Sequence, residues 1–132
     1  MTIKTGKRYN YENLAKRIND IAKKIIYYRY GKANSGEWRS VKFKSFTIKQ
    51  QVFFIGTKTE IVTRGKTAFK IQTSGLSGFI TELKMNKSLL TFKILDELFG
   101  VENLIETVKN KKIYYEIRNK AKKELDRLLN AR

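Results

Sequence analysis

Apolar residues in the first quarter of the chain recur at the spacing of an α-helix. Successive members of this stripe lie four, three and four residues apart: Leu14, Ile18, Ile21 and Ile25. The period predicts an amphipathic helix over residues 10–30 with one apolar side. Gly31 is a typical end for such a helix, and the turn-forming residues after it predict a loop over residues 31–40.

Apolar and polar residues alternate between residues 41 and 83, which is the pattern of half-buried β-strands. The alternation slips by one position at Ser45, which indicates a bulge or a bend. Turn signals at residues 64–65 and 74–78 divide the rest. We expect about five short antiparallel strands, built from these segments: 41–49, 51–55, 59–63, 66–73 and 79–83.

The Arg64-Gly65 pair predicts a tight hairpin. With a two-residue turn, Val62 would share a face with Phe69 and Ile71. The opposite face would carry Ile61, Ala68, Lys66 and Lys70.

The C-terminal third has helical spacing throughout. We expect one helix over residues 87–99, ended by Gly100, and a short helix over 101–108. A long helix is expected over residues 110–130. The chain is therefore predicted to be a single α+β domain over residues 1–132, with an N-terminal helix, an antiparallel sheet and a helical C-terminal third.

Composition excludes several kinds of site. The 132 residues contain no cysteine and no histidine, so a disulfide, a Cys/His zinc site and a Ser-His-Asp triad are all excluded. No apolar run approaches the roughly 18–20 residues that span a bilayer, and the polar segment 1–8 is not followed by a signal-peptide core. We expect no catalytic residue, no metal, no cofactor and no membrane partner, and a location in the cytoplasm or in a virion.

Charge gives the strongest functional signal, because 29 Lys and Arg face 12 Asp and Glu for a net charge of +17. The acids are unevenly placed. Residues 94–108 contain no base and four acids, whereas the segments on either side are strongly basic. This asymmetry predicts an oriented surface for a polyanion.

DNA or RNA is the expected partner. Lysines that alternate with apolar residues would form a basic sheet face, with Trp38 at its edge as a stacking platform for single strands. Basic helix residues near the C-terminus would add phosphate contacts, with little sequence readout. The candidate binding residues are Trp38, Arg39, Lys42, Lys44, Lys49, Arg64, Lys66, Lys70, Lys111, Lys112, Arg118 and Lys122. A phage or viral accessory role is one setting for such a protein.

A small Mg²⁺-dependent nuclease is the enzymatic alternative. Glu12 on the first helix, Glu60 and then Glu82-Leu83-Lys84 have the order acid, acid, Glu-x-Lys that is found in metal-dependent nucleases of the restriction-enzyme type. This sequence departs from the nuclease motif because no Pro-Asp pair lies next to Glu60.

Further hypotheses concern the macromolecule that this protein binds. The acids Asp96, Glu97, Glu102 and Glu106 would suit an adaptor that docks on a host protein, or would neutralise lysines within the molecule. A helix-turn-helix over residues 94–110 is disfavoured, because Glu102 and Glu106 would repel phosphates. A homodimer through an edge strand or the C-terminal helix stays open.

Overall fold

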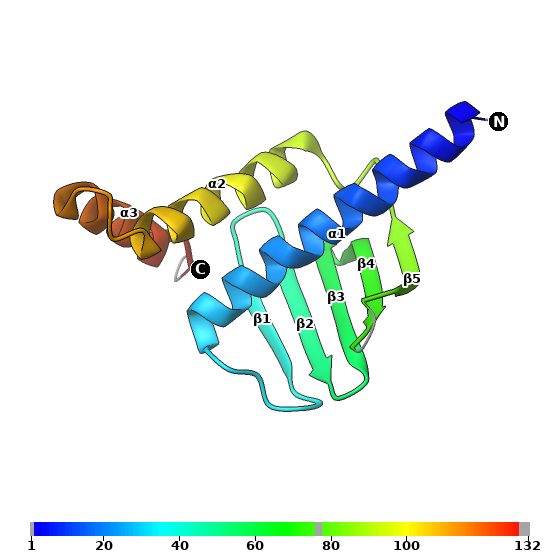
Figure 1. The fold of residues 1–132 in the computed structure, drawn as a ribbon, viewed down its shortest axis with the longest axis horizontal. Coiled ribbons are helices and arrows are strands. Elements are labelled where there is room, and N and C mark those ends of the chain that lie inside the picture. The colour runs from blue at the N-terminus through cyan, green and yellow to red at the C-terminus, as the bar shows by residue number, and fades with distance from the viewer. Residues whose placement is uncertain (1, 76–77, 130–132) are drawn as a thin grey trace.

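The computed structural model describes residues 2–75 and 78–129. Three helices lie on one face of a five-stranded antiparallel sheet (Figure 1). The expected α+β fold is therefore confirmed. The elements follow in the order α1 Thr2–Tyr30, β1 Trp38–Lys42, β2 Thr47–Phe53, β3 Gly56–Thr63, β4 Lys66–Ser74, β5 Ile80–Met85, α2 Phe92–Lys109 and α3 Tyr115–Leu129.

Helix α1 crosses the sheet and supplies much of the core (Figure 1). Ile18, Ile21 and Ile25 of the predicted stripe are fully buried. Burial of each such side chain contributes roughly 1.5–3 kcal/mol, so the stripe fixes which side of α1 faces the strands. The helix begins at Thr2, well before the predicted start, and ends at Tyr30, just before Gly31, whose N–H donates to the Tyr27 carbonyl oxygen at 2.7 Å.

The strands form a simple meander in the order β1-β2-β3-β4-β5. Of the two alternatives expected at Ser45, the structure has the bend and not the bulge, and this bend is the turn between β1 and β2. The Phe43 N–H donates to the Phe46 carbonyl oxygen at 2.7 Å, and the two rings stack with centroids 4.8 Å apart. Because both rings are buried, the tight turn allows two apolar residues three apart to face the same core.

The β3–β4 hairpin has a different register from the predicted one. Ile61 faces Phe69, and Val62 faces Thr67, so Ala68 is an extra residue in β4. A bulge of this kind shifts the alternation by one position. As a result Ile61, Ala68 and Phe69 are all buried, whereas Val62 turns to the other face, which reverses the prediction for Val62, Ile61 and Ala68.

Helix α2 continues through Gly100, where the sequence predicts a helix end. Leu98, Val101 and Ile105 are buried on both sides of the glycine, and their packing outweighs the roughly 1 kcal/mol that glycine costs in a helix interior. The chain therefore makes no turn at Gly100, which rules out the helix-turn-helix. The turn comes later, at residues 110–114, so α3 begins at Tyr115 rather than Asn110; Asn130 of the predicted helix lies outside the described residues.

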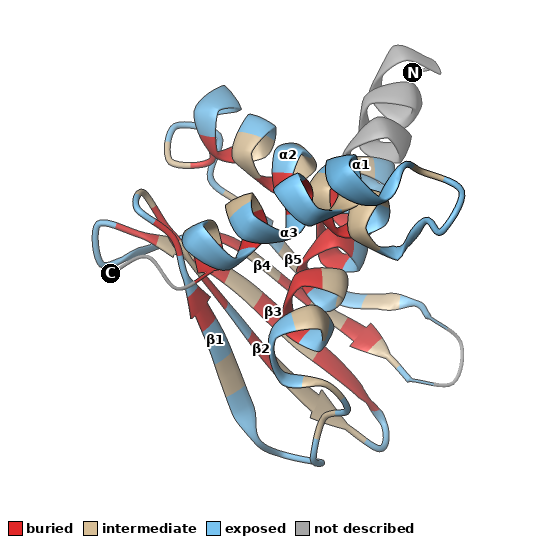
Figure 2. Ribbon diagram, turned by 90° about the vertical axis from the view of Figure 1, so that its left-hand side faces the viewer, coloured by how far each residue is buried: buried red, intermediate tan, exposed pale blue. Residues whose placement is uncertain are grey.

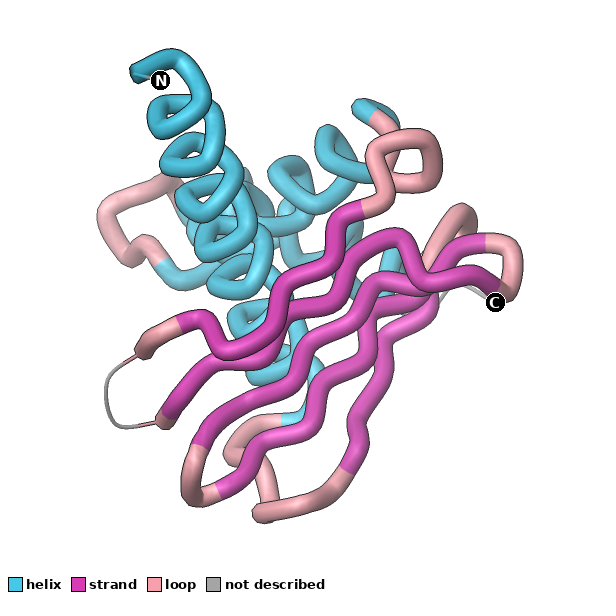
Figure 3. The backbone as a smooth tube through the Cα atoms, turned by 90° about the vertical axis from the view of Figure 1, so that its right-hand side faces the viewer, coloured by secondary structure: helices cyan, strands magenta, loops and turns pink. Residues whose placement is uncertain are grey.

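The helices stack on one side only. Helix α1 contacts β1 and β2, α2 packs on α1, and α3 packs on α2. Figure 2 shows buried residues concentrated between these helices and the strands. Figure 3, from the opposite side, shows the strands in front of the helices. No helix within residues 2–75 and 78–129 covers this second face of the sheet, and no helix of that part of the chain is long and apolar enough to cross a membrane.

Candidate nucleic-acid interface

The uncovered side of the sheet, here named the open face, is defined by the strand register. Its side chains alternate with the buried ones and form three cross-strand rows. The first row is Trp38, Gln51, Lys58, Gln72 and Glu82; the second is Ser40, Lys49, Glu60, Lys70 and Lys84; the third is Lys42, Thr47, Val62 and Thr67. Five lysines therefore share this face with two acids.

The lysines of the open face are mostly free of acidic partners. Lys70 forms an ion pair with Glu82 at 3.7 Å, a long contact between partly exposed groups that contributes little. Glu60 lies in register between Lys49 and Lys70. Within the described part of the chain, however, it forms no ion pair within 4 Å. The face is therefore basic and solvated rather than neutralised by its own acids.

Trp38 stands at the edge of the open face, with 46% of its surface exposed. Beside it lies a hollow of about 360 Å³, lined by Trp38, Arg39, Ser40, Lys49 and Glu60. An exposed indole next to an ammonium group is an arrangement on which a nucleobase can stack while its phosphate is neutralised.

Arg39 takes a different position from its predicted partners. It alternates with Trp38 and Ser40, and its side chain is only 11% exposed. Its guanidinium donates to the carbonyl oxygens of Gly31 and Lys32 and to the Glu37 carboxylate, and lies 5.6 Å from the Tyr30 ring centroid. Arg39 therefore ties β1 to the end of α1, which holds Trp38 in place.

Three predicted bases lie in or next to turns at one end of the sheet. Lys44 is in the β1–β2 turn, Arg64 is in the β3–β4 turn, and Lys66 is the first residue of β4. The Thr63 hydroxyl donates to the Ser45 carbonyl oxygen at 2.9 Å, which joins the two turns. Lys44 and Arg64 are exposed in the turns beyond Lys42. Lys66 pairs with Thr63 and alternates with Thr67 of the open face, so its side chain leaves β4 on the covered side of the sheet.

The other end of the sheet presents apolar side chains to solvent. Phe54 is 87% and Phe79 72% exposed, in the β2–β3 and β4–β5 connections. The Gly75 N–H donates to the Ile55 carbonyl oxygen at 2.6 Å, which draws the two connections together. Only glycine fits at position 56, because a Cβ there would lie 2.0 Å from the Thr73 carbonyl oxygen.

The predicted bases near the C-terminus do not join the open face. Lys111 and Lys112 are exposed in the α2–α3 turn, and Arg118 and Lys122 lie on α3. They belong to the helical layer, on the far side of the sheet from Lys49.

Two lysines of the open face were missing from the predicted set. The alternation predicts a strand that begins at Thr59 and so does not include Lys58, whereas β3 begins at Gly56. Its ammonium lies 5.6 Å from the Phe53 ring centroid. Lys84 was assigned to a nuclease motif, but it faces Lys70 across β4 and β5. Extending the alternation by two residues at each strand end would have found both.

Two acids of residues 94–108, Glu102 and Glu106, form ion pairs within the molecule. Glu102 is only 2% exposed, and its two oxygens accept from Arg17 at 2.5 and 2.6 Å and from Lys24 at 2.8 Å. Glu106 accepts from Lys24 at 3.2 Å. The hydrogen bonds from Arg17 and then Lys24 lower the pKa of Glu102 despite its burial, and they raise the pKa of both bases. Glu102 is thus not an exposed carboxylate that a partner can reach, whereas Asp96 is exposed.

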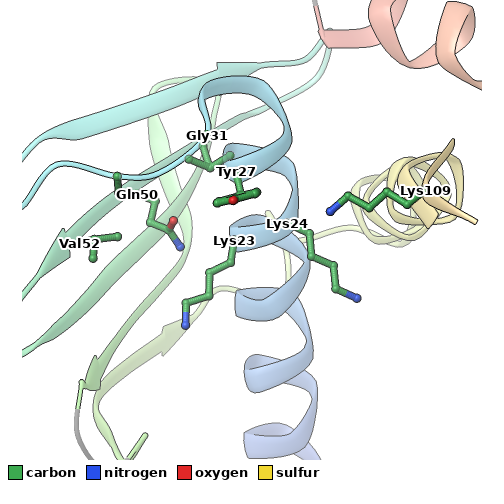
Figure 4. A pocket seen from close by; sticks show the side chains of 9 residues that line it. Lys23, Lys24, Tyr27, Gly31, Gln50, Val52 and Lys109 are labelled. Atoms are coloured by element: carbon green, nitrogen blue, oxygen red, sulfur yellow. The ribbon is translucent and has the colours of Figure 1, made fainter.

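A further basic pocket of about 340 Å³ lies between α1, α2 and β2. Figure 4 shows Lys109 reaching toward Tyr27, and its ammonium lies 5.8 Å from that ring centroid. Lys23 points away from Tyr27. Since Lys24 is held by Glu102 and Glu106, the positive charge here is smaller than on the open face.

The described residues contain no group of three carboxylate, imidazole or thiolate side chains able to hold a metal ion. Glu60 and Glu82 lie on β3 and β5 with β4 between them, in different rows. The Glu82–Lys84 pair shares a face, but Glu82 reaches toward Lys70.

Function therefore has to be argued from the site itself, because comparison with protein-family models, curated proteins and solved structures finds no match to this chain.

Proposed function

We propose that this protein binds single-stranded nucleic acid along the open face of its sheet. The observation that carries the proposal is an uncovered basic face with an exposed tryptophan above a hollow at its edge. Lys42, Lys49, Lys58, Lys70 and Lys84 would neutralise phosphates, and Trp38 would stack on a base.

A single strand suits this surface better than a duplex. The open face belongs to a broad sheet, whereas a duplex is usually read by a helix or a two-stranded ribbon that enters a groove. The bases of an unpaired strand can turn toward Trp38 while the backbone follows the lysines. Most contacts are then to phosphate, so overall sequence preference is small.

The direct test is fluorescence anisotropy with labelled single-stranded DNA, single-stranded RNA and duplex DNA of equal length, each titrated with salt. Five phosphate contacts on a single strand give a slope of about −3.5 in log K against log salt, or roughly a hundredfold loss between 50 and 200 mM. We expect this slope and a clear preference for single strands. Equal, weak binding of all three polymers would refute the proposal.

A further inference from the structure

Glu60 is out of place on a surface for phosphates. Its carboxylate sits near the centre of the open face, in register between two lysines. Yet it forms no ion pair in the part of the chain that the structure describes, while Glu82 pairs with Lys70. An unpaired carboxylate weakens the attraction for phosphate, which suggests that it has a different task.

The hollow beside Trp38 places this carboxylate next to Lys49. Ser40, Lys49 and Glu60 face one another across β1, β2 and β3 in a single row, and all three line the hollow together with Trp38. Side chains directly opposite on neighbouring strands have Cβ atoms about 4.5–5.5 Å apart. The hollow therefore presents a donor of three hydrogen bonds beside a group that only accepts.

We infer that this hollow selects guanine in the bound strand, an inference that rests on the proposed single-strand binding. The Watson–Crick edge of guanine carries an acceptor, O6, followed by two adjacent donors, N1–H and N2–H. With the base stacked on Trp38, the Lys49 ammonium donates to O6 and the Glu60 carboxylate accepts from N1–H and N2–H.

The other bases match this pair less well. Thymine and uracil have one N–H between two carbonyl oxygens, so one oxygen would face the Glu60 carboxylate. Cytosine and adenine offer one amino group beside a ring nitrogen that only accepts. A missing partner leaves a polar group unsatisfied in the hollow, and this mismatch is what produces selectivity.

The test uses labelled dT12 and dT12 variants with one central dG, dA or dC, measured by anisotropy at fixed salt. We expect the dG oligonucleotide to bind about tenfold more tightly than dT12, as a bidentate base contact provides. Glu60→Gln should abolish this preference while binding of dT12 is unchanged or tighter, because a negative charge is removed.

Glu82→Gln is the matched control. It removes a carboxylate from the same face but outside the hollow, so it should keep the dG preference. If the wild-type protein binds none of the oligonucleotides, the proposed function fails and the guanine site with it. If it binds dT12 without preferring dG, or if Glu60→Gln keeps the preference, only the guanine site is wrong. A thermal melt of each variant excludes unfolding as the cause.

Discussion

The open face of the sheet and the α1–α2 interface both combine bases with acids, but only one of them leaves its bases free. At the interface, Arg17 and Lys24 converge on Glu102, which is 2% exposed. On the open face, five lysines surround two acids, and the one ion pair among the described residues of that face is 3.7 Å long. A net charge of +17 is therefore not spread evenly over the surface.

Burial explains the difference. Charges held away from water interact more strongly than exposed ones, so a buried carboxylate such as Glu102 requires partners. Lysines on a solvated face keep their hydration and their loosely held counterions. Those counterions are what a polyanion displaces when it binds.

The comparison is tested most strongly by removing three lysines of the open face together. Lys49→Ala, Lys58→Ala and Lys70→Ala in one protein should weaken single-strand binding about a hundredfold at 100 mM salt and reduce the salt slope by about 2, since each phosphate contact contributes about 0.7 to it. Anisotropy titrations across salt measure both quantities.

The matched control changes the same charge in the helical layer. Lys111→Ala, Lys112→Ala and Lys122→Ala should leave affinity within a few-fold of the wild-type value, because only long-range attraction is lost. Equal losses in the two triple variants would show that net charge, and not the open face, drives binding.

Trp38→Ala should weaken binding by about 1–3 kcal/mol, the usual contribution of one stacked base, without altering the salt slope. Trp38→Phe should recover much of the loss. Phe92→Ala serves as control, because Phe92 is 86% exposed in the helical layer. A reduced slope in Trp38→Ala would mean that the variant has disturbed the lysines, which would undermine the stacking role.

Glu102→Gln should have its effect on stability and not on binding. We expect a loss of about 1–3 kcal/mol in the free energy of unfolding, typical of a hydrogen-bonded charged group, measured by urea denaturation at neutral pH. The two bases are 46% and 41% exposed, so they remain hydrated and the loss stays below that of a fully buried pair.

The pH dependence of stability follows from the lowered pKa of Glu102. Unfolding returns this pKa to its ordinary value near 4.5, so the unfolded chain takes up a proton first as the pH falls. The stabilisation is complete above that value and is lost as the pH falls through the lower pKa of the folded state. The acid-induced loss of stability should be smaller in Glu102→Gln than in the wild type; an identical loss in both would contradict this account.

The smallest effect is expected at Glu124, which pairs with Arg127 on the exposed side of α3. The pair lowers the pKa of Glu124 through a hydrogen bond from Arg127, but the Arg127 and Glu124 side chains are 67% and 44% exposed. Glu124→Gln should therefore leave the melting temperature unchanged within error. A clear destabilisation would show that exposed pairs of the helical layer resemble Glu102 more than we infer.

The faces of the strands could be predicted where buried and exposed residues alternate. They were predicted wrongly where packing against another element interrupts that alternation. The antiparallel order and the number of strands follow from alternation. The bounds of the first two strands do not, because segment 41–49 contains the end of β1, a turn and the start of β2, and segment 51–55 contains the end of β2 and the β2–β3 connection. The bulge at Ala68 does not, because it depends on fitting Ala68 and Phe69 against the helices at once. The helix end predicted at Gly100 is wrong for a similar reason. The low helix propensity of glycine favours an end there, but tertiary packing of the helix outweighs that propensity.

The candidate site was predictable in part. Lys42, Lys49 and Lys70 do share one face with Trp38, as the alternation indicates. Arg39 turns to the other side and holds the α1–β1 loop instead. The hollow with Glu60 needs three adjacent strands to form, and no local pattern in the sequence indicates it.

The sequence by itself determined the types of the elements, the antiparallel meander and the concentration of acids in residues 94–108, because each depends on near neighbours along the chain. Only the tertiary structure decided which charged side chains form ion pairs within the molecule and which remain exposed to a partner. Arg17 and Glu102 are 85 residues apart in the chain, so their pairing depends on how α1 and α2 pack. That packing neutralises bases on one side of the molecule and leaves the lysines of the other side in solvent.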